Sequence, residues 1–266
     1  MDEKMISFRE LGLSEAMCKA LEKKGYGYPT TIQAKAIPEF MQWKDVIAKA
    51  PTGTGKTFAF GIPMIEHIDP KCEDVQGLIL APTRELSIQI GDELRSLLTY
   101  YQGIRVAVLY GGAGIVGQAK QLEKKPQIVV ATPGRLMDHY NRKNIRFDKI
   151  QTVVLDEADR MLDMGFFKDV TKIIEKVKNR RNLGLFSATI SQEVMTVSWM
   201  VTITIRPRLK RLSVQAVIGI RILISSMVGR TQQEQVFRLS SMLTMQCRPD
   251  LTQLRIVVIL TILVRV

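Results

Sequence analysis

Six short apolar runs, separated by helical patterns, constrain the fold of this 266-residue chain more than any other feature. The runs are residues 46–48, 78–81, 106–109, 128–131, 153–155 and 183–186. Apolar residues are nearly continuous in each run, as in parallel strands that are buried on both faces. Between the runs, in 84–101 and 169–178 for example, apolar residues recur every three or four positions. The alternation predicts an α/β fold with a doubly wound, mostly parallel sheet.

The N-terminal region predicts a helix that precedes the first strand. Ser14 is a suitable N-cap, the helix extends to Lys24, and Gly25 is placed to end it. This N-terminus is charged and lacks the apolar stretch of a secretory signal. No apolar run reaches the roughly 18 residues that a membrane span needs. We therefore expect no membrane association.

Cysteine usage points to a reducing compartment. The chain has three cysteines, which are far apart and have no histidine or cysteine at metal-ligand spacing. A disulfide scaffold and a zinc site are therefore not expected, and the predicted location is the cytoplasm.

The last quarter of the chain differs in composition from the rest. Residues 1–200 carry 28 basic and 24 acidic side chains, whereas residues 201–266 carry 10 and 2, so the tail supplies +8 of the net charge of +12. A basic RNA-binding extension is one interpretation of this irregular C-terminal segment. A non-native or shifted reading frame, or a poorly folding remnant, agrees better with its lack of helical or strand periodicity.

A glycine-rich segment follows the first apolar run and opens a helix. It is residues 50–57, Ala-Pro-Thr-Gly-Thr-Gly-Lys-Thr. Its glycines allow backbone N–H groups to face phosphate oxygens, and the following helix N-terminus is electropositive. Lys56 is suited to the β- and γ-phosphates and the Thr57 hydroxyl to Mg²⁺. The predicted nucleotide-binding residues here are Thr52, Gly53, Thr54, Gly55, Lys56 and Thr57. An ordinary glycine-rich turn is the alternative.

An acidic tetrad, Asp156-Glu157-Ala158-Asp159, follows the fifth apolar run. A carboxylate at the end of a buried strand is suited to hold the Mg²⁺–water shell, and a second is suited to orient an attacking water. Asp156 and Glu157 match these two roles. Such a tetrad alone is more often a solvated turn or a helix N-terminus. Together with the glycine-rich loop upstream, it favours the catalytic interpretation instead.

Polar groups also follow the other apolar runs. They are Pro82-Thr83-Arg84-Glu85-Leu86, Gly111-Gly112, Thr132-Pro133-Gly134-Arg135 and Ser187-Ala188-Thr189. Ligands of open α/β sheets bind at the carboxyl ends of the strands, so we expect most of these groups at one edge. Arg84 and Arg135 are suited to phosphates, and the glycine pair and Thr132 to a nucleic-acid backbone. Helix capping and tight turns are the alternative explanations.

These motifs, taken in order, resemble the first RecA-like domain of DEAD-box ATP-dependent RNA helicases over residues 1–200. Residues 25–33, Gly-Tyr-Gly-Tyr-Pro-Thr-Thr-Ile-Gln, resemble the Q motif. The resemblance implies that the Gln33 amide recognises adenine, that Phe8 packs on the base, and that Tyr26 also belongs to the nucleotide site. Residues 50–57 resemble motif I, and residues 156–159 are similar to the motif that names the family.

The resemblance also assigns roles to the other residues. Catalysis and metal binding fall to Lys56, Asp156, Glu157 and Thr57, and Ser187, Thr189 and Asp159 resemble the group that couples hydrolysis to strand separation. The implied RNA contacts are Pro82, Thr83, Arg84, Gly111, Gly112, Thr132, Pro133, Gly134 and Arg135. Contacts to phosphates and 2′-hydroxyls imply little sequence preference.

Three domain segments are predicted: an N-terminal helix and Q-motif region over 1–34, a RecA-like P-loop ATP-binding domain over 35–200, and the atypical basic tail over 201–266. The resemblance implies a monomer that uses ATP and Mg²⁺, and it does not identify any protein partner.

Three functional hypotheses remain open. The first is an ATP-dependent RNA helicase, or RNA-stimulated ATPase. The second is an isolated ATP-binding and weakly RNA-binding module, because the family's second RecA-like domain is not recognisable after residue 200. The third is another P-loop nucleic-acid ATPase, such as a DNA helicase, against which the Q-motif residues and the Asp-Glu-Ala-Asp spelling argue.

Overall fold

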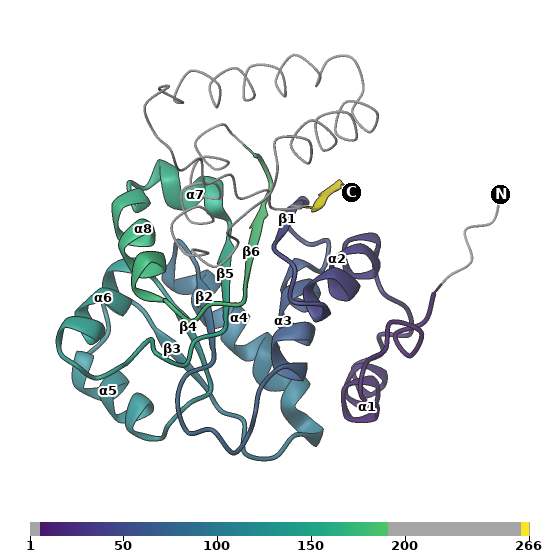
Figure 1. Ribbon diagram of the computed structural model, residues 1–266, viewed down its shortest axis with the longest axis horizontal. Coiled ribbons are helices and arrows are strands. Elements are labelled where there is room, and N and C mark those ends of the chain that lie inside the picture. Colours follow the sequence, from purple (N-terminus) through teal and green to yellow (C-terminus); the bar gives the residue numbers. More distant parts are fainter. Residues whose placement is uncertain (1–5, 191–261, 266) are drawn as a thin grey trace, which may run out of the picture. The chain divides into compact units, whose positions relative to one another are not determined.

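A computed structural model describes residues 6–190 and 262–265, and a parallel sheet lies at the centre of this described part (Figure 1). Its strands are β1 (Val46–Lys49), β2 (Gly77–Leu80), β3 (Val106–Leu109), β4 (Ile128–Ala131), β5 (Thr152–Asp156), β6 (Asn182–Ser187) and β7 (Ile262–Arg265). They lie in the order β3-β4-β2-β5-β6-β1-β7, and every pairing is parallel. The predicted parallel α/β sheet is confirmed, and each of the six predicted runs matches its strand to within one residue at either end.

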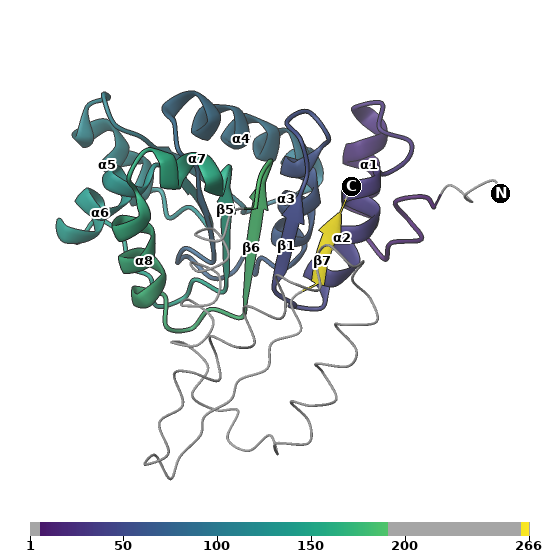
Figure 2. The same ribbon diagram turned by 90° about the horizontal axis from the view of Figure 1, so that it is seen from above.

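Helices cover both faces of the sheet (Figure 2). The connections from β1 to β2 and from β2 to β3 contain α3 (Lys56–Glu66) and α4 (Arg84–Leu97), which pack against each other. Later connections run back across the sheet in the opposite direction. Since crossovers between parallel strands are right-handed, their helices lie on the other face. These are α6 (Pro133–Asn141), α7 (Ala158–Asp163) and α8 (Phe167–Lys176), while α5 (Ile115–Glu123) packs beside the edge strand β3.

Two helices precede β1. The first, α1 (Glu15–Lys23), begins where predicted, because the Ser14 hydroxyl accepts the N–H of Met17 at 3.2 Å. It ends before Gly25, whose φ of +80° suits glycine. The second, α2 (Thr31–Met41), packs on α3. A short 3₁₀ turn, η1 (Leu98–Tyr100), extends α4 to within one residue of the end of the predicted helical pattern.

Aromatic rings fill the core between α2, α3 and the strands β1 and β6. The Phe186 ring lies edge-on to Phe60 at a centroid distance of 5.0 Å and to Phe40 at 6.5 Å. Gly184 leaves room for this cluster, because a Cβ there would be 3.0 Å from the Phe40 ring. This close packing fixes the positions of β1 and β6, and therefore the points from which the loops after them begin.

In the tail, only β7 belongs to the described residues. It pairs with β1 in parallel, Val46 with Ile262 and Lys49 with Arg265, and the sequence did not predict it. The rest of 201–266 lies outside the described residues, and so do both interpretations of the tail. Among the described residues, no helix combines the length and the apolarity that a membrane crossing requires.

Candidate active site at the carboxyl edge of the sheet

The strand order sorts the predicted site residues into two groups. All strands are parallel, so the loops that follow them lie at one edge of the sheet. The neighbouring strands β5, β6 and β1 lead into the acidic tetrad, Ser187–Thr189 and the glycine-rich loop. The neighbouring strands β3, β4 and β2 lead into the predicted nucleic-acid contacts. Chain order does not show this division, since β1 precedes β2 and β3 in the sequence.

The glycine-rich loop connects β1 to α3 and turns at two left-handed glycines. Gly53 has φ +84° and Gly55, which directly precedes α3, has φ +87°. Lys56 is 6% exposed, and its Nζ donates to the Ala50 carbonyl at 2.9 Å across the loop. The Thr54 hydroxyl donates to the Pro51 carbonyl at 2.8 Å. The loop thus has the backbone conformation and the single ammonium group that a phosphate-binding loop requires.

Gln33 is bound to this loop. Its Nε2 donates to the Gly55 carbonyl at 3.1 Å, and its Oε1 accepts the N–H of Thr30 at 3.0 Å. The Thr30 hydroxyl donates to the Thr54 carbonyl at 2.9 Å. Gln33, which was predicted to recognise adenine, therefore lies directly beside the predicted phosphate site, and this contact was not predicted.

The two predicted aromatic residues differ in exposure. Phe8 is 4% exposed and belongs to the hydrophobic core. Tyr26 is 44% exposed and lies edge-on to Phe58 of α3, with ring centroids 5.1 Å apart. Of the two rings, only that of Tyr26 is open to a ligand in this structure.

The acidic tetrad begins with a buried carboxylate. Asp156 ends β5 and is 3% exposed; burial raises its pKa to about 7, although the nearby Lys56 ammonium lowers it. Its Oδ1 accepts the N–H of Glu157 at 3.0 Å. Glu157 has φ +50°, an uncommon conformation for a residue with a side chain and one that is typical of functional sites. Its carboxylate lies 3.3 Å from the Arg160 guanidinium.

The oxygen ligands at this edge fit a magnesium–nucleotide complex. In the described ranges, 6–190 and 262–265, no three His, Cys, Asp or Glu side chains cluster as a metal cage. Mg²⁺ does not need one, because it keeps several waters and takes one or two carboxylates together with substrate phosphates. Asp156 and the Thr57 hydroxyl supply hard oxygen atoms of this kind. The buried carboxylate also lacks full charge compensation, as its raised pKa shows.

Asp159 connects the tetrad to the end of β6. The Ser187 hydroxyl accepts the N–H of Asp159 at 3.2 Å, and Thr189 donates both its N–H and its hydroxyl to Asp159 Oδ2, at 2.9 and 2.6 Å. Burial raises the pKa of Asp159, but the hydrogen bonds from Thr189 and Ser187 outweigh it, and the net pKa is lowered. The three residues predicted to couple hydrolysis to strand separation are therefore in direct contact.

In the second group of loops, the residues after β2 and β3 lie together. Pro82 is buried, and the Thr83 hydroxyl accepts the N–H of Leu86 and caps α4. The exposed Arg84 guanidinium lies 4.9 Å from the centre of the Tyr110 ring, next to Gly111 and Gly112. Both glycines are exposed, and Gly112 has φ +81°.

The residues after β4 begin α6. Thr132 is 9% exposed, Pro133 is the buried first residue of the helix, and Gly134 follows it, partly buried. Arg135 points its guanidinium toward the neighbouring loop: Nη1 donates to the Ala113 carbonyl at 2.9 Å and to Gln118 Oε1 at 3.0 Å. Gln118 was not among the residues predicted from the sequence. The spacing of four residues between Gln118 and Leu122, which places both on the buried face of α5, could have indicated that Gln118 is buried.

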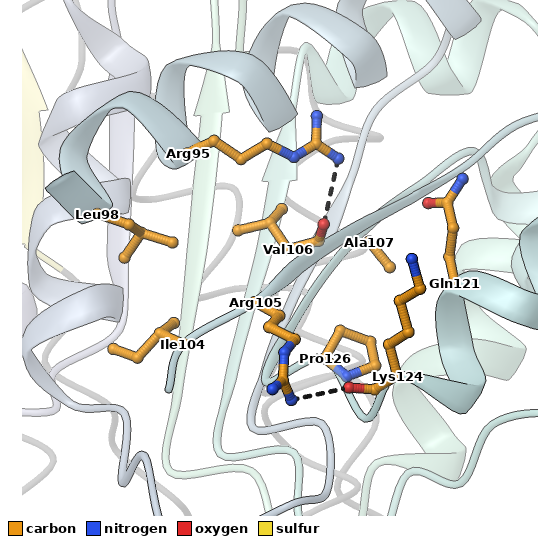
Figure 3. A pocket seen from close by; sticks show the side chains of 9 residues that line it. All are labelled: Arg95, Leu98, Ile104, Arg105, Val106, Ala107, Gln121, Lys124 and Pro126. Carbon is orange, nitrogen blue, oxygen red and sulfur yellow. Dashed lines mark hydrogen bonds between the residues drawn. The ribbon is translucent and has the colours of Figure 1, made fainter. Parts of the chain in front are cut away.

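A cavity of about 500 Å³ lies elsewhere, beside β3 (Figure 3). Its lining combines apolar residues of β3 and its surroundings with Arg95, Arg105, Gln121 and Lys124. Arg95 donates to the Val106 carbonyl at 3.1 Å and Arg105 to the Lys124 carbonyl at 3.0 Å. None of the predicted site residues lines it, so the cavity is separate from the candidate active site.

The parallel sheet, the glycine-rich loop after β1 and the carboxylate at the end of β5 define a P-loop protein of the RecA-like α/β class. A family model described as DEAD/DEAH box helicase matches residues 30–197, well over half of the chain. The chain therefore belongs to the DEAD/DEAH box helicase family.

Relatives and solved structures agree with this assignment. The DEAD-box ATP-dependent RNA helicase CshA of Bacillus cereus is 46% identical over 194 residues, which make up 73% of this chain and 37% of the relative. CshA of Listeria monocytogenes is 48% identical over 193 residues, with the same two shares. A crystal structure of a DEAD box protein from Methanococcus jannaschii superposes with a TM-score of 0.69 at 44% identity, over 73% of this chain and 53% of that one. The chain thus spans little more than a third of the length of these curated relatives.

Proposed function

We propose that this chain acts as the ATP-binding and RNA-binding part of an ATP-dependent RNA helicase. The observation that carries the proposal is the division of the sheet edge by the strand order. The glycine-rich loop and the carboxylates lie on the β5-β6-β1 side, and the residues predicted to contact a nucleic-acid backbone lie on the β3-β4-β2 side. The relatives named RNA helicases support the same function.

In this proposal, ATP binds on the β5-β6-β1 side. Residues 52–57 surround the phosphates, with the Lys56 ammonium on the β- and γ-phosphates. Gln33 recognises the adenine edge, and the exposed Tyr26 ring supplies an aromatic surface for the base. Phe8 packs on the base only after leaving the core in which this structure buries it. The Gln33–Gly55 hydrogen bond supports a base site that responds to the state of the phosphate loop.

Hydrolysis falls to the carboxylates in this proposal. Asp156 and the Thr57 hydroxyl hold Mg²⁺, which neutralises charge on the phosphates when it is bound. Glu157 orients the water that attacks the γ-phosphate, and its strained backbone conformation supports a functional role. Asp159, Ser187 and Thr189 couple the turnover to the state of the RNA, which their direct contacts support.

RNA binds on the β3-β4-β2 side. The residues assigned to it are Pro82, Thr83, Arg84, Gly111, Gly112, Thr132, Pro133, Gly134 and Arg135. Arg84 is the exposed cation of this set, and the exposed glycines permit close approach of a sugar–phosphate backbone. We also propose a monomer in the cytoplasm, in keeping with the unpaired cysteines Cys18 and Cys72 of the described region.

The test is Mg²⁺-dependent ATP binding and hydrolysis by the full chain, with and without single-stranded RNA. Lys56→Ala abolishes nucleotide binding, because it removes the only ammonium group in the loop. Glu157→Gln retains binding and loses turnover. Lys71→Ala and Glu123→Gln remove exposed charges of the same types outside the site and serve as matched controls.

Each outcome decides between the candidate functions. Unchanged turnover in Glu157→Gln contradicts the assignment of that residue. ATP and RNA binding without stimulated turnover selects the binding module instead. Equal binding of DNA and RNA, or no preference for adenine over guanine nucleotides, selects another P-loop nucleic-acid ATPase.

A further inference from the structure

Gln118 is a buried polar residue on α5 whose amide nitrogen and amide oxygen both have hydrogen-bond partners. It is 3% exposed and lies on the same helix face as Leu122. Its Nε2 donates to the Tyr110 carbonyl at 2.9 Å. Its Oε1 accepts from Arg135 Nη1 at 3.0 Å and lies 3.3 Å from His139 Nε2. One amide therefore contacts the end of β3 and two side chains of α6.

Donor and acceptor rules fix the orientation of this amide. The Asn144 amide nitrogen, which can only donate, lies 3.1 Å from His139 Nδ1. His139 Nδ1 is therefore the acceptor, and the proton of the neutral ring is on Nε2, facing Gln118. Burial first, and then the nearby Arg135, lower the pKa of His139, which keeps the ring neutral. Gln118 Oε1 thus meets two donors, and its NH₂ group must face the Tyr110 carbonyl.

These bonds hold both ends of the loop that contains Gly111 and Gly112. Gln118 binds the carbonyl of Tyr110 before the pair, and Arg135 binds the carbonyl of Ala113 after it. The glycines themselves have open space where a side chain would lie, with no atom within 4 Å. Packing at the glycines contributes little to the loop's position, so the two flanking carbonyls must fix it.

Gln118 is also connected to the residues that follow β2. The Tyr110 ring lies beneath the Arg84 guanidinium, and Arg135 follows β4. Gln118 therefore connects the three strand ends on the β3-β4-β2 side, although it has no exposed surface with which to touch a ligand.

We propose that Gln118 is a positioning residue that holds the Gly111–Gly112 loop, with Arg84 and Arg135, in the geometry that binds an RNA backbone. The inference rests on the proposed function of this edge as the RNA site. It adds a residue that acts on RNA affinity through the loop alone.

The test compares Gln118→Met with Gln121→Met in the full chain. Both replace a glutamine of α5 by a side chain of similar length, but Gln121 is exposed and contacts β3 beside the cavity of Figure 3. Binding of fluorescent single-stranded RNA is measured by anisotropy with Mg²⁺ and a non-hydrolysable ATP analogue. Loss of the buried bonds weakens RNA binding about tenfold in Gln118→Met. RNA binding in Gln121→Met and nucleotide affinity in both variants stay unchanged.

A second readout does not depend on RNA. Amide hydrogen exchange at residues 110–114 becomes about tenfold faster in Gln118→Met, because the loop loses its anchor, while exchange in residues 50–57 stays the same. Gln118→Glu keeps the volume and the acceptor oxygens, replaces the donor to Tyr110 by a carboxylate oxygen, and adds a negative charge beside Arg135. It therefore reproduces the exchange change even if the methionine variant folds poorly.

The outcomes separate the two proposals. Unchanged exchange in both Gln118 variants overturns the positioning role. Faster exchange with unchanged RNA affinity also overturns it, since the loop then does not control binding. A wild-type chain that binds no RNA contradicts the proposed function, while the exchange measurement still decides whether Gln118 holds the loop.

Discussion

Thr189 donates two hydrogen bonds to one oxygen of Asp159, from its backbone N–H at 2.9 Å and from its hydroxyl at 2.6 Å. The two residues are 30 positions apart in the chain, and adjacent strands bring them together. The acidic tetrad at the start of α7 is thereby tied to the segment that leaves β6. Movement of one of these segments must therefore displace or break its contact with the other.

The first prediction concerns this bond. Thr189→Val keeps the side-chain shape and removes the hydroxyl donor to a carboxylate, so it lowers the free energy of unfolding by about 1–2 kcal/mol. Urea denaturation at pH 7 measures the change. Thr171→Val is the matched control: its hydroxyl donates only to the Phe167 carbonyl within α8, so we expect a change below about 0.5 kcal/mol. Equal losses of unfolding free energy in the two variants would contradict the prediction that the hydroxyl bond to Asp159 stabilises the fold more than a hydroxyl bond within a helix.

The second prediction separates backbone strain from collision in the glycine-rich loop. Gly53→Ala places a side chain at φ +84° with open space around it, which costs about 1–2 kcal/mol. Gly55→Ala has the same strain at φ +87°, and its Cβ also collides with Nε2 of Gln33. We therefore expect Gly55→Ala to lower stability more and to displace Gln33.

Thermal unfolding and nucleotide affinity check this pair. Gly117→Ala, in the open face of α5, serves as the control and stabilises by about 0.5–1 kcal/mol. A Gly55→Ala variant no less stable than Gly53→Ala refutes the contact between Gln33 and the loop.

The third prediction follows from the pKa of Asp156. This pKa is raised to about 7 from an unfolded value of 3.8, so between these values the native state binds more protons than the unfolded state. Stability therefore falls as the pH rises from about 4 to 7, and the full cost of the buried charge is present above pH 7. Asp156→Asn removes that charge and raises the free energy of unfolding at pH 8 by on the order of 2–4 kcal/mol.

The stabilisation that Asp156→Asn brings is smaller at pH 5, because native Asp156 is already largely protonated there. Denaturation at both pH values measures it, and a destabilised asparagine variant at pH 8 would falsify the argument. The same variant also loses Mg²⁺-dependent nucleotide binding.

The fourth prediction concerns the exposed edge of the sheet. On the edge strand β3, Arg95 donates to the outward-facing carbonyl of Val106 (Figure 3). Gln121 accepts the outward-facing N–H of Val108. Side chains that occupy such groups prevent edge-to-edge pairing with another chain. Arg95→Ala therefore increases aggregation on mild heating, as measured by light scattering. Arg146→Ala, which breaks only an exposed ion pair with Asp74, leaves aggregation unchanged.

The sequence predicted most of the local structure. Parallel strands that are covered on both faces are continuous apolar runs, and such runs located β1 to β6 to within one residue. Capping chemistry located the start of α1 at Ser14. These features depend on neighbouring residues alone, and for that reason periodicity and caps reveal them.

Long-range contacts were not predictable in the same way. The strand order that separates the two groups of loops depends on how the crossovers pack, and no local pattern encodes it. The hydrogen bond from Gln33 to Gly55 joins residues 22 positions apart. Gln118 was not predicted, because a single glutamine on an amphipathic helix is normally interpreted as a surface residue. Its buried partners become apparent only in the structure.

The common direction of the strands also decides where the protein can be modified without harm. Turns that precede the strands lie at the opposite edge from the candidate active site. Gln102 is exposed in such a turn, and at least the length of β3, about 13 Å, separates it from Gly111. A fluorophore attached there through an introduced cysteine would report on tumbling and assembly, while both ligand surfaces stay unobstructed.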